Sequence, residues 1–359
     1  LHAQPATRMP DVVVTGSRIE TPLHDRLTDV SLITREEIER AGQSSLADVL
    51  RMTQGVEFVT NGGPGSSTSV FMRGASNAQV IVLIDGQRVG SSTTGTANWQ
   101  ALPLSQIDRI EILRGPASSL YGADAIGGVV QIFTRQGGGP TAFDAEFGGG
   151  SYNTWRIGAG VRGGDERFRY SLRGGYEDSQ GFNAIRNREA FGFNPDLDGN
   201  RQGNVSGQFG YTVAQGHELG LQFLENRQRG RYDVSANFDD RIYTTIRSVA
   251  ATSTNRLTPI WTSRLRLGET ADLSDNVSAT DVSRFNTHQR QYAWQNDIGL
   301  GDAKLQLALE RREERLFTTF ALPTNTRDTN SGVGVLQWTP GNHILQASAR
   351  QDNSTQYGG

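Results

Sequence analysis

Six oxygen-bearing residues in two stretches of the chain have the types and spacing of a cation site. Asp196 and Asp198 stand one residue apart and are followed by Gly199. Calcium binds several carboxylate and carbonyl oxygens, and two aspartates beside a glycine can curl around one ion. The sequence therefore favours a Ca²⁺ site, with solvated turn aspartates as the alternative that it leaves open. The predicted metal-binding residues are Asp196, Asp198, Tyr232, Asp233, Asp239 and Asp240.

The rest of the chain carries no pattern of a catalytic site. It has no cysteine, which excludes disulfides, thiolate catalysis and cysteine metal ligands. The five histidines, at positions 2, 24, 217, 288 and 343, include no pair at ligand spacing. Nucleophile-elbow, Walker and zinc-protease motifs are missing, so we do not expect an enzyme. The net charge of −3 argues against a nucleic-acid groove, which needs a basic stripe.

The first 140 residues mix helix and strand signals. Thr34 and Glu37 have the spacing of a capping box, which predicts a helix that begins at residue 35. Apolar residues between 46 and 50 predict a second short helix that ends near Gly55. Strands are predicted over 80–84, 87–90, 108–113 and 128–134, and Asp85-Gly86 suits a type I′ turn. We expect one α+β domain whose core holds Ile84, Ile110, Ile112, Val130 and Ile132.

After residue 140 the helix signals stop and apolar residues recur at every second position. Phe168, Tyr170 and Leu172 alternate with polar residues, and the same period continues in later segments. A soluble antiparallel sandwich also alternates. Short turns at 163–165 and 301–302, long connections at about 180–201 and 228–256, and a charged, glycine-rich second face instead favour a transmembrane β-barrel. No apolar run is long enough for a transmembrane helix.

Several segments resemble the signatures of a known family, in the family's order. They are Asp11-Val12-Val13-Val14-Thr15-Gly16, Phe71-Met72-Arg73-Gly74, the run from Val82 to Arg88, and the run from Ile110 to Gly122. These resemble the TonB box and plug signatures of the TonB-dependent outer-membrane receptors. Asn61-Gly62-Gly63, Ser105 to Gly128 and Ala347 to Gln356 are most similar to the cobalamin receptors of that family.

The resemblance implies an all-β transmembrane barrel with an N-terminal α+β plug domain. We expect a disordered terminus or signal-peptide remnant at 1–10, a TonB box at 11–16, the plug at 17–140 and a partial barrel at 141–359. The alternating segments number roughly 10 to 12, against about 22 strands in barrels of this type. The chain is thus expected to be the N-terminal fragment of a longer receptor.

The resemblance also implies roles for individual residues. Asp11, Val12, Val13, Val14 and Thr15 would bind TonB and, through it, the inner-membrane energising complex. Arg73 and Arg114 would hold the plug against the barrel, and the aspartate loops would bind Ca²⁺, although Asn183 stands where the family has a further aspartate. The ligand-binding residues would be Asn61, Gly62, Gly63, Ser66, Ser67, Ser91, Ser92, Thr93 and Asn98.

The function implied is TonB-dependent uptake of cobalamin across the outer membrane of a Gram-negative bacterium. No cofactor beyond the possible Ca²⁺ is expected, and the partners would be TonB, the ligand and outer-membrane lipid. A ferric-siderophore or haem receptor is the alternative within the family. Two other classes stay open on the alternation alone: a passive porin or structural barrel, and a soluble carbohydrate-binding β-protein.

Overall fold

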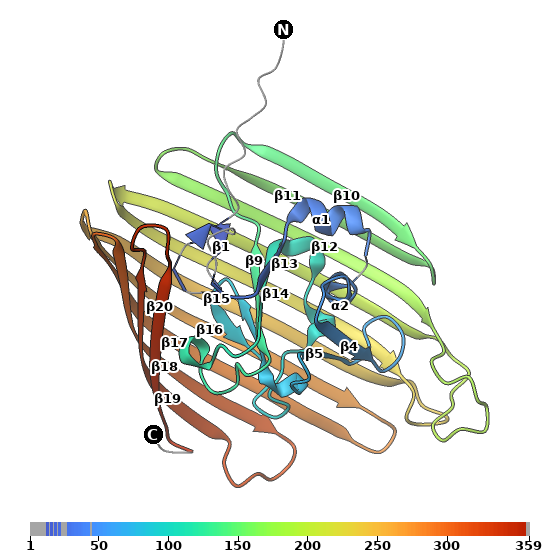
Figure 1. Ribbon diagram of the computed structural model, residues 1–359. Helices are drawn as coiled ribbons and strands as arrows, with labels where there is room; N and C mark the ends of the chain where they lie inside the picture. The colour runs from blue at the N-terminus through green and yellow to red at the C-terminus, as the bar shows by residue number, and fades with distance from the viewer. Residues whose placement is uncertain are drawn as a thin grey trace.

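The protein consists of a small α+β domain that lies against the concave face of a curved eleven-stranded wall (Figure 1). In the computed structural model, the residues that can be described are 12–13, 15–16, 18–19, 21–22, 27–43 and 45–356. Asp11 and Val14 of the predicted TonB box lie outside these residues, as does the predicted terminus at 1–10. Among the described helices, none is long and apolar enough to cross a membrane.

The plug, as we call the small domain, is built on a five-stranded sheet with the order β3-β8-β9-β6-β7. Two two-stranded sheets, β1-β2 and β4-β5, accompany it. The strands are β1 Val12–Val13, β2 Thr21–Pro22, β3 Val30–Ile33, β4 Val56–Thr60, β5 Thr68–Met72, β6 Val80–Ile84, β7 Gln87–Val89, β8 Ile107–Arg114 and β9 Gly128–Thr134. The predicted strands are therefore present, and β3 was not predicted.

The plug helices begin where the sequence indicated. Helix α1, Arg35–Ala41, has the predicted capping box: the Glu37 amide donates to the Thr34 hydroxyl at 3.3 Å, and the Thr34 amide donates to the Glu37 carboxylate at 2.8 Å. Helix α2, Leu46–Arg51, has Met52 as its C-cap and so ends earlier than the predicted end near Gly55. A third helix, α3, covers Ser118–Tyr121, and the described residues of the domain also form the short 3-10 helices η2 Asn77–Gln79, η3 Trp99–Ala101 and η4 Leu104–Gln106.

The core and the hairpin turn of the plug agree with the sequence prediction. Ile84, Ile110, Ile112, Val130 and Ile132 are each no more than 2% exposed. They pack in one cluster with the apolar face of α2, which fixes the helix on the sheet. The turn between β6 and β7 has positive φ at both central positions, 47° at Asp85 and 80° at Gly86, as a type I′ turn requires.

The wall is an antiparallel sheet in which every strand pairs with the next one along the chain. Its edge strands, β10 and β20, are not paired with each other, so the described wall is open. The strands are β10 Ala142–Gly150, β11 Thr154–Gly164, β12 Phe168–Phe182, β13 Asp198–Ala214, β14 His217–Tyr232, β15 Asp240–Thr258, β16 Trp261–Val277, β17 Val282–Leu300, β18 Ala303–Thr318, β19 Thr326–Trp338 and β20 Leu345–Ser354.

Long and short connections alternate between the ends of the wall, as predicted, but two long loops are shorter than expected. They cover 183–197 and 233–239, because β14 continues to Tyr232 and β15 already begins at Asp240. The polar composition of 228–256 suggested a loop. Strand residues near the rim of a barrel face water or the lumen and need not be apolar, which explains the error.

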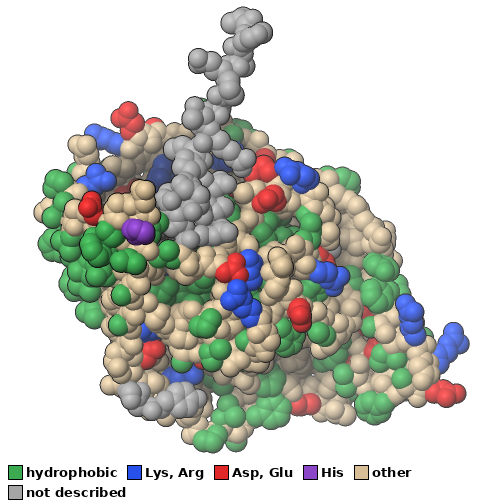
Figure 2. Space-filling model, viewed as in Figure 1, with side chains coloured by type: hydrophobic (Ala, Val, Ile, Leu, Met, Phe, Trp, Pro, Cys, Tyr) green, Lys and Arg blue, Asp and Glu red, His purple; other side chains and the backbone are tan. Residues whose placement is uncertain are grey.

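The two faces of the wall differ as the period of two predicted. On β12, Leu172 is 42% exposed on the outer face, whereas its neighbour Arg173 is 2% exposed on the inner face. Asn226 and Gln228 of β14 likewise point inward and donate to plug carbonyls. Figure 2 shows the plug from the open side, with positive and negative side chains interspersed on this face. The apolar outer face is the one suited to lipid.

Candidate functional site

Three of the predicted metal ligands meet at the long-loop end of the wall. Asp196 lies in the loop between β12 and β13, Asp198 begins β13, and Asp233 begins the loop between β14 and β15. One carboxylate oxygen from each lies within 4.8 Å of the others. The pairing of β13 with β14 brings together two loops that are separated in sequence.

The three carboxylates have oxygens suited to a cation. Asp196 Oδ1, Asp198 Oδ1 and Asp233 Oδ2 are buried and accept no hydrogen bond. Asp198 is oriented by the Ala184 amide, which donates to its other oxygen at 2.9 Å. Negative charges this close repel one another unless a cation or protons offset them. The donor set therefore fits Ca²⁺, to which three carboxylates can supply up to six oxygens.

Asp233 carries the electrostatic mark of this crowding. Its pKa is raised to about 6, first by burial and then by the charges of Asp198 and Asp196. At neutral pH the carboxyl is therefore ionised, but less favourably than an ordinary aspartate. A bound cation would remove the repulsion that raises this pKa.

Two other predicted metal ligands, Asp239 and Asp240, have other partners, which corrects the prediction for these two residues. Asp240 accepts from the amides of Val234 and Ser235 and so closes its own loop. Asp239 forms ion pairs with Arg231 and Arg241. Neither belongs to the three-carboxylate cluster. Tyr232 offers no carboxylate, and its role as a metal ligand stays a prediction. The side-chain amide of Asn183 donates to the main-chain oxygen of Asn194, so this residue closes the first loop.

The two loops predicted to bind ligand both lie toward the same end of the wall as the aspartates. In the first, Gly63 packs against β13: a Cβ built on it would lie 3.4 Å from the main-chain oxygen of Asp198. Asn61 and Ser67 are exposed, whereas Ser66 is buried and Gly62 is half-buried. In the second, Ser91 is buried and Thr93 is exposed.

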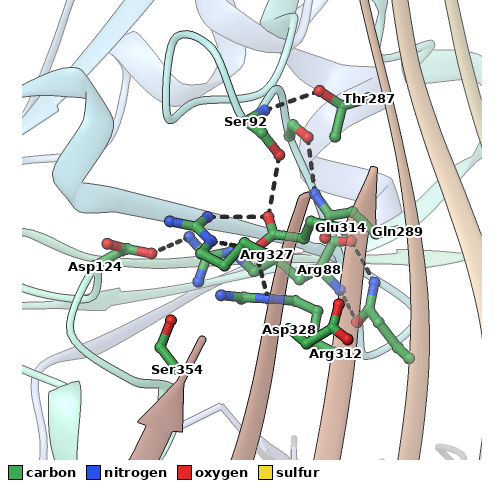
Figure 3. A network of polar contacts seen from close by, with 12 residues as sticks. Arg88, Ser92, Asp124, Thr287, Gln289, Arg312, Glu314, Arg327, Asp328 and Ser354 are labelled. Atoms are coloured by element: carbon green, nitrogen blue, oxygen red, sulfur yellow. Dashed lines mark hydrogen bonds and ion pairs between the residues drawn. The ribbon is translucent and has the colours of Figure 1, made fainter. Parts of the chain in front are cut away.

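Two residues predicted to bind ligand instead join the plug to the wall. The amide and side chain of Asn98 both donate to Asp272 of β16, which is 1% exposed. Ser92 donates from its amide to Thr287 at 2.9 Å and from its hydroxyl to Glu314 at 3.2 Å (Figure 3). These contacts fix the loop at both ends, and residues 93–95 between them are exposed.

Glu314 belongs to an ion network that borders a cavity of about 430 Å³ between the plug and the wall. Figure 3 shows Arg327 and Arg312 of the wall beside Glu314, and Arg88 of the plug paired with Asp124. Sequence reasoning missed this network. Its members come from four distant segments, and no local pattern connects them.

The arginines predicted to hold the plug to the barrel bind within the plug. Arg73 donates to Asp29 at 2.6 Å, and Arg114 donates to both oxygens of Asp29 and to Ser31. The prediction is therefore wrong for the eleven described wall strands. Asp29 precedes β3, the strand that the sequence did not reveal, and β3 places this carboxylate beside both arginines.

Most described contacts between the plug and the wall use amide side chains. Gln87 donates to Ser248 at 2.9 Å, and the Gln291 side chain accepts from the Arg88 amide at 2.9 Å. Neutral amides satisfy polar groups at an interface without the desolvation cost of buried charges. The plug is thus held by many modest hydrogen bonds, each worth about 1 kcal/mol.

The predicted TonB box lies against the plug where it can be described. Val12 and Val13 form β1, which pairs with β2. Thr15 is fully buried, and its main-chain oxygen accepts from the Tyr121 hydroxyl at 3.0 Å. Arg18 follows and forms an ion pair with Glu310 of β18, which also binds Arg350 of β20. This three-residue ion cluster was not predicted, since its members lie far apart in the sequence.

Comparison with known proteins agrees with this architecture. Residues 22–129 match the family model described as the TonB-dependent Receptor Plug Domain. The chain is 31% identical over 355 residues to a protein named Vitamin B12 transporter from Photobacterium profundum, covering 97% of this chain and 57% of that protein. It is 30% identical to a protein of the same name from Vibrio cholerae, covering 100% of this chain and 59% of the relative. The chain thus spans little more than half of these relatives.

Solved structures agree in fold. The siderophore receptor PirA from Acinetobacter baumannii superposes with a TM-score of 0.78 at 18% identity, covering 92% of this chain and 57% of that one. The ferric yersiniabactin uptake receptor FyuA from Yersinia pestis superposes with a TM-score of 0.70 at 17% identity, covering 91% and 61%. With its plug packed inside an open wall of barrel strands, the chain belongs to the TonB-dependent receptors.

Proposed function

We propose that the full receptor takes up cobalamin across the outer membrane of a Gram-negative bacterium, with energy supplied by TonB. Sequence similarity supports cobalamin, because the relatives at 30% and 31% identity are named vitamin B12 transporters. The siderophore receptors are similar at 17% to 18% identity, a level that supports the fold alone. A ferric siderophore is therefore the competing ligand in the test.

One structural observation carries the proposal: the candidate cation site and the first ligand loop form one continuous surface. Gly63 packs against the main chain of Asp198, and the Gln228 side chain donates to the main-chain oxygen of Gly65 at 3.0 Å. A cation at Asp196, Asp198 and Asp233 would fix the outer loops directly beside the plug loop. A large polar ligand that meets ordered loops loses less conformational entropy on binding.

The test is ligand binding to the purified full-length receptor. We expect cyanocobalamin to bind and ferric enterobactin not to bind, and chelation of calcium to weaken cyanocobalamin binding. Asp198→Asn should weaken binding in the same way, because it removes a charge from the cation site. Asp165→Asn, in a short turn at the opposite end of the wall, is the matched control. Preference for the ferric siderophore would replace cobalamin with that ligand class.

Energy coupling is tested at β1. Proline at Val13 removes an amide that an added strand of TonB would need, so Val13→Pro should abolish energised uptake and leave ligand binding unchanged. Val13→Ala keeps the amide and is the control. Uptake that continues in Val13→Pro would point to a passive pore, and equal loss of binding and uptake would make β1 a structural strand.

A further inference from the structure

Arginines gather on the outer face of the wall, on the three neighbouring strands β13, β14 and β15. Their direction follows from the strand period: Asn226 and Gln228 point inward to the plug, so Glu225, Arg227 and Arg229 point outward. The pairing register extends this outer face across β13 and β15. The outer arginine patch consists of Arg201, Arg227, Arg229, Arg231, Arg241 and Arg247.

Two pairs within the patch place like charges directly opposite each other. Arg201 of β13 pairs with Arg229 of β14, and Arg231 of β14 pairs with Arg241 of β15. Directly opposite like charges destabilise an antiparallel sheet, since their Cβ atoms are only about 5 Å apart. Elsewhere on this face the register places unlike charges across from each other: Arg247 of β15 pairs with Glu225 of β14.

The acidic residues nearby only partly offset the patch. Asp178 binds Arg201, Glu225 binds Arg227 and Arg247, and Asp239 binds Arg231 and Arg241. Three carboxylates thus face six arginines. In the described part of the chain Arg229 forms no ion pair, and its guanidinium lies 5.9 Å from the centre of the Tyr243 ring.

A hollow of about 370 Å³ opens among these side chains. Arg201, Arg229 and Arg231 line it from β13 and β14. The remaining lining residues are Asp178, Ser179, Gln180, Leu197, Gly199 and Asn200. The guanidinium group presents several donors in a planar fork that matches phosphate oxygens. The lining is therefore suited to a phosphate group.

The position of the patch along the strands of the wall indicates the source of that phosphate. Directly below it, toward the short-turn end, the same outer face becomes apolar. Phe223 pairs with Val249, and Leu221 and Leu219 follow on β14. The patch thus lies at the upper border of the band that contacts hydrocarbon, where lipid headgroups are located.

We propose that the outer arginine patch binds the phosphate groups of an anionic lipid in the leaflet at the long-loop end of the barrel. One phosphate between Arg201 and Arg229 would convert the repulsion of that pair into attraction. The inference rests on the membrane placement of the wall and not on the identity of the transported ligand. It also places lipid beside β13, the strand that begins with Asp198 of the cation site.

The proposal is tested with the full-length receptor in a neutral detergent. Lipid A, whose headgroup carries two phosphates, is titrated and followed by native mass spectrometry, with monophosphoryl lipid A and soluble pyrophosphate in parallel. The double variant Arg201→Gln, Arg229→Gln should bind lipid A about thirtyfold more weakly, since each of the two arginines contributes about 1 kcal/mol near a lipid surface and about 1.4 kcal/mol is a factor of ten. Monophosphoryl lipid A should bind the wild type more weakly than lipid A does.

The matched control removes two other arginines from the same outer face. Arg284 and Arg290 stand opposite Asp275 and Glu269, so Arg284→Gln, Arg290→Gln removes equal charge without removing a like-charge pair. This control should bind lipid A as the wild type does. In the lipid-free receptor, Arg229→Gln alone should raise the thermal midpoint by removing the repulsion, which keeps the test informative if the double variant folds poorly.

Three results would overturn the proposal: equal weakening in the control, unchanged lipid A binding in the double variant, or pyrophosphate binding as tight as that of lipid A. Cyanocobalamin binding is measured on the same samples. The patch variants should retain it, so a failure of the lipid proposal is distinguishable from a failure of the proposed transport function.

Discussion

The main-chain amide and the hydroxyl of Thr15 both donate to one carboxylate oxygen of Glu111, at 2.9 and 2.7 Å. Both residues are fully buried, and 96 positions separate them. Thr15, the last of the residues predicted to bind TonB, is therefore bound to β8 in the plug sheet. Hydrogen bonds to a charged group are worth about 1.5 to 3 kcal/mol, so these bonds oppose release of the segment.

Thr15→Val in the full-length receptor should release the segment that precedes it. The substitution keeps the shape of the side chain and the hydrogen bond from the main-chain amide. It removes the hydrogen bond from the hydroxyl to Glu111. A nitroxide at Val12→Cys reports the effect, because the chain has no cysteine of its own. We expect narrower EPR lines than in the parent. Thr94→Val, in the exposed apical loop, is the control, and unchanged spectra in Thr15→Val would show that the bond does not hold β1.

Glu310→Gln should destabilise the receptor more than Arg18→Gln. Glu310 is shared by Arg18 and Arg350, so its removal leaves two largely buried cations without this carboxylate. Arg18→Gln leaves Glu310 paired with Arg350. Breaking a buried pair costs about 3 kcal/mol or more where a charge is left uncompensated. Thermal unfolding in detergent measures the stability of both variants. An equal decrease in the thermal midpoint would mean that Arg350 does not balance the charge of Glu310 when Arg18 is removed.

The sequence predicted the parts of the fold that depend on local chemistry. The capping box at Thr34, the Asp85-Gly86 turn and the alternation along β12 each follow from neighbouring residues, and each is present. Strand β3 was missed because Val-Ser-Leu-Ile has no clear alternation and is too short to stand out. Its partner on β8 is distant in sequence, and only that pairing makes it a strand.

The candidate site was predictable to the same extent. Asp196 and Asp198 are separated by one residue in the sequence, and Asp233 joins them through the pairing of β13 with β14. Asp239 has the same residue type and a similar position, yet Arg231 and Arg241 bind it. Composition cannot distinguish a carboxylate that faces an arginine from one that faces other carboxylates. That distinction requires the register of the strands.

Asn98→Ala and Thr93→Ala should separate a structural contact from a ligand contact. Asn98 donates twice to buried Asp272, so its removal leaves a buried carboxylate without these donors and should destabilise the receptor by about 1 to 3 kcal/mol. Thr93 is exposed, and its substitution should change ligand affinity and leave the thermal midpoint unchanged. Loss of affinity in Asn98→Ala with an unchanged midpoint would instead make Asn98 a direct ligand contact.

Asn183→Asp should tighten calcium binding. The Asn183 side chain donates to the Asn194 carbonyl, and an aspartate there cannot donate and adds a negative charge near Asp198. Without a cation the first loop should become less ordered, whereas with calcium the added charge favours binding. Isothermal titration should show a lower Kd than in the parent. Asn187→Asp, in the exposed part of the same loop, is the control, and equal tightening there would indicate a nonspecific charge effect.

Calcium binding should depend on pH through Asp233. Burial and the charges of Asp198 and Asp196 raise the pKa of this carboxyl to about 6 from 3.8. In the calcium-free receptor, Asp233 takes up its proton as the pH falls through about 6, whereas the unfolded chain does so only near 3.8. The group therefore destabilises the calcium-free loops increasingly as the pH rises from about 4 to about 6, and the repulsion is complete above that range.

Calcium reverses this dependence, because the ion binds the ionised carboxylate and must displace the proton below about pH 6. Calcium affinity should rise as the pH rises through about 6 and level off above it. Hydrogen exchange of residues 183–197 and 233–239, with and without calcium at about pH 5 and about pH 7.5, measures both effects. Calcium should protect both loops at the higher pH and have little effect at the lower one.

Asp233→Asn should abolish the pH step, whereas Asp165→Asn should keep it, since two backbone amides hold the pKa of Asp165 below its usual value. Calcium protection that is equal at both pH values would exclude Asp233 as a ligand.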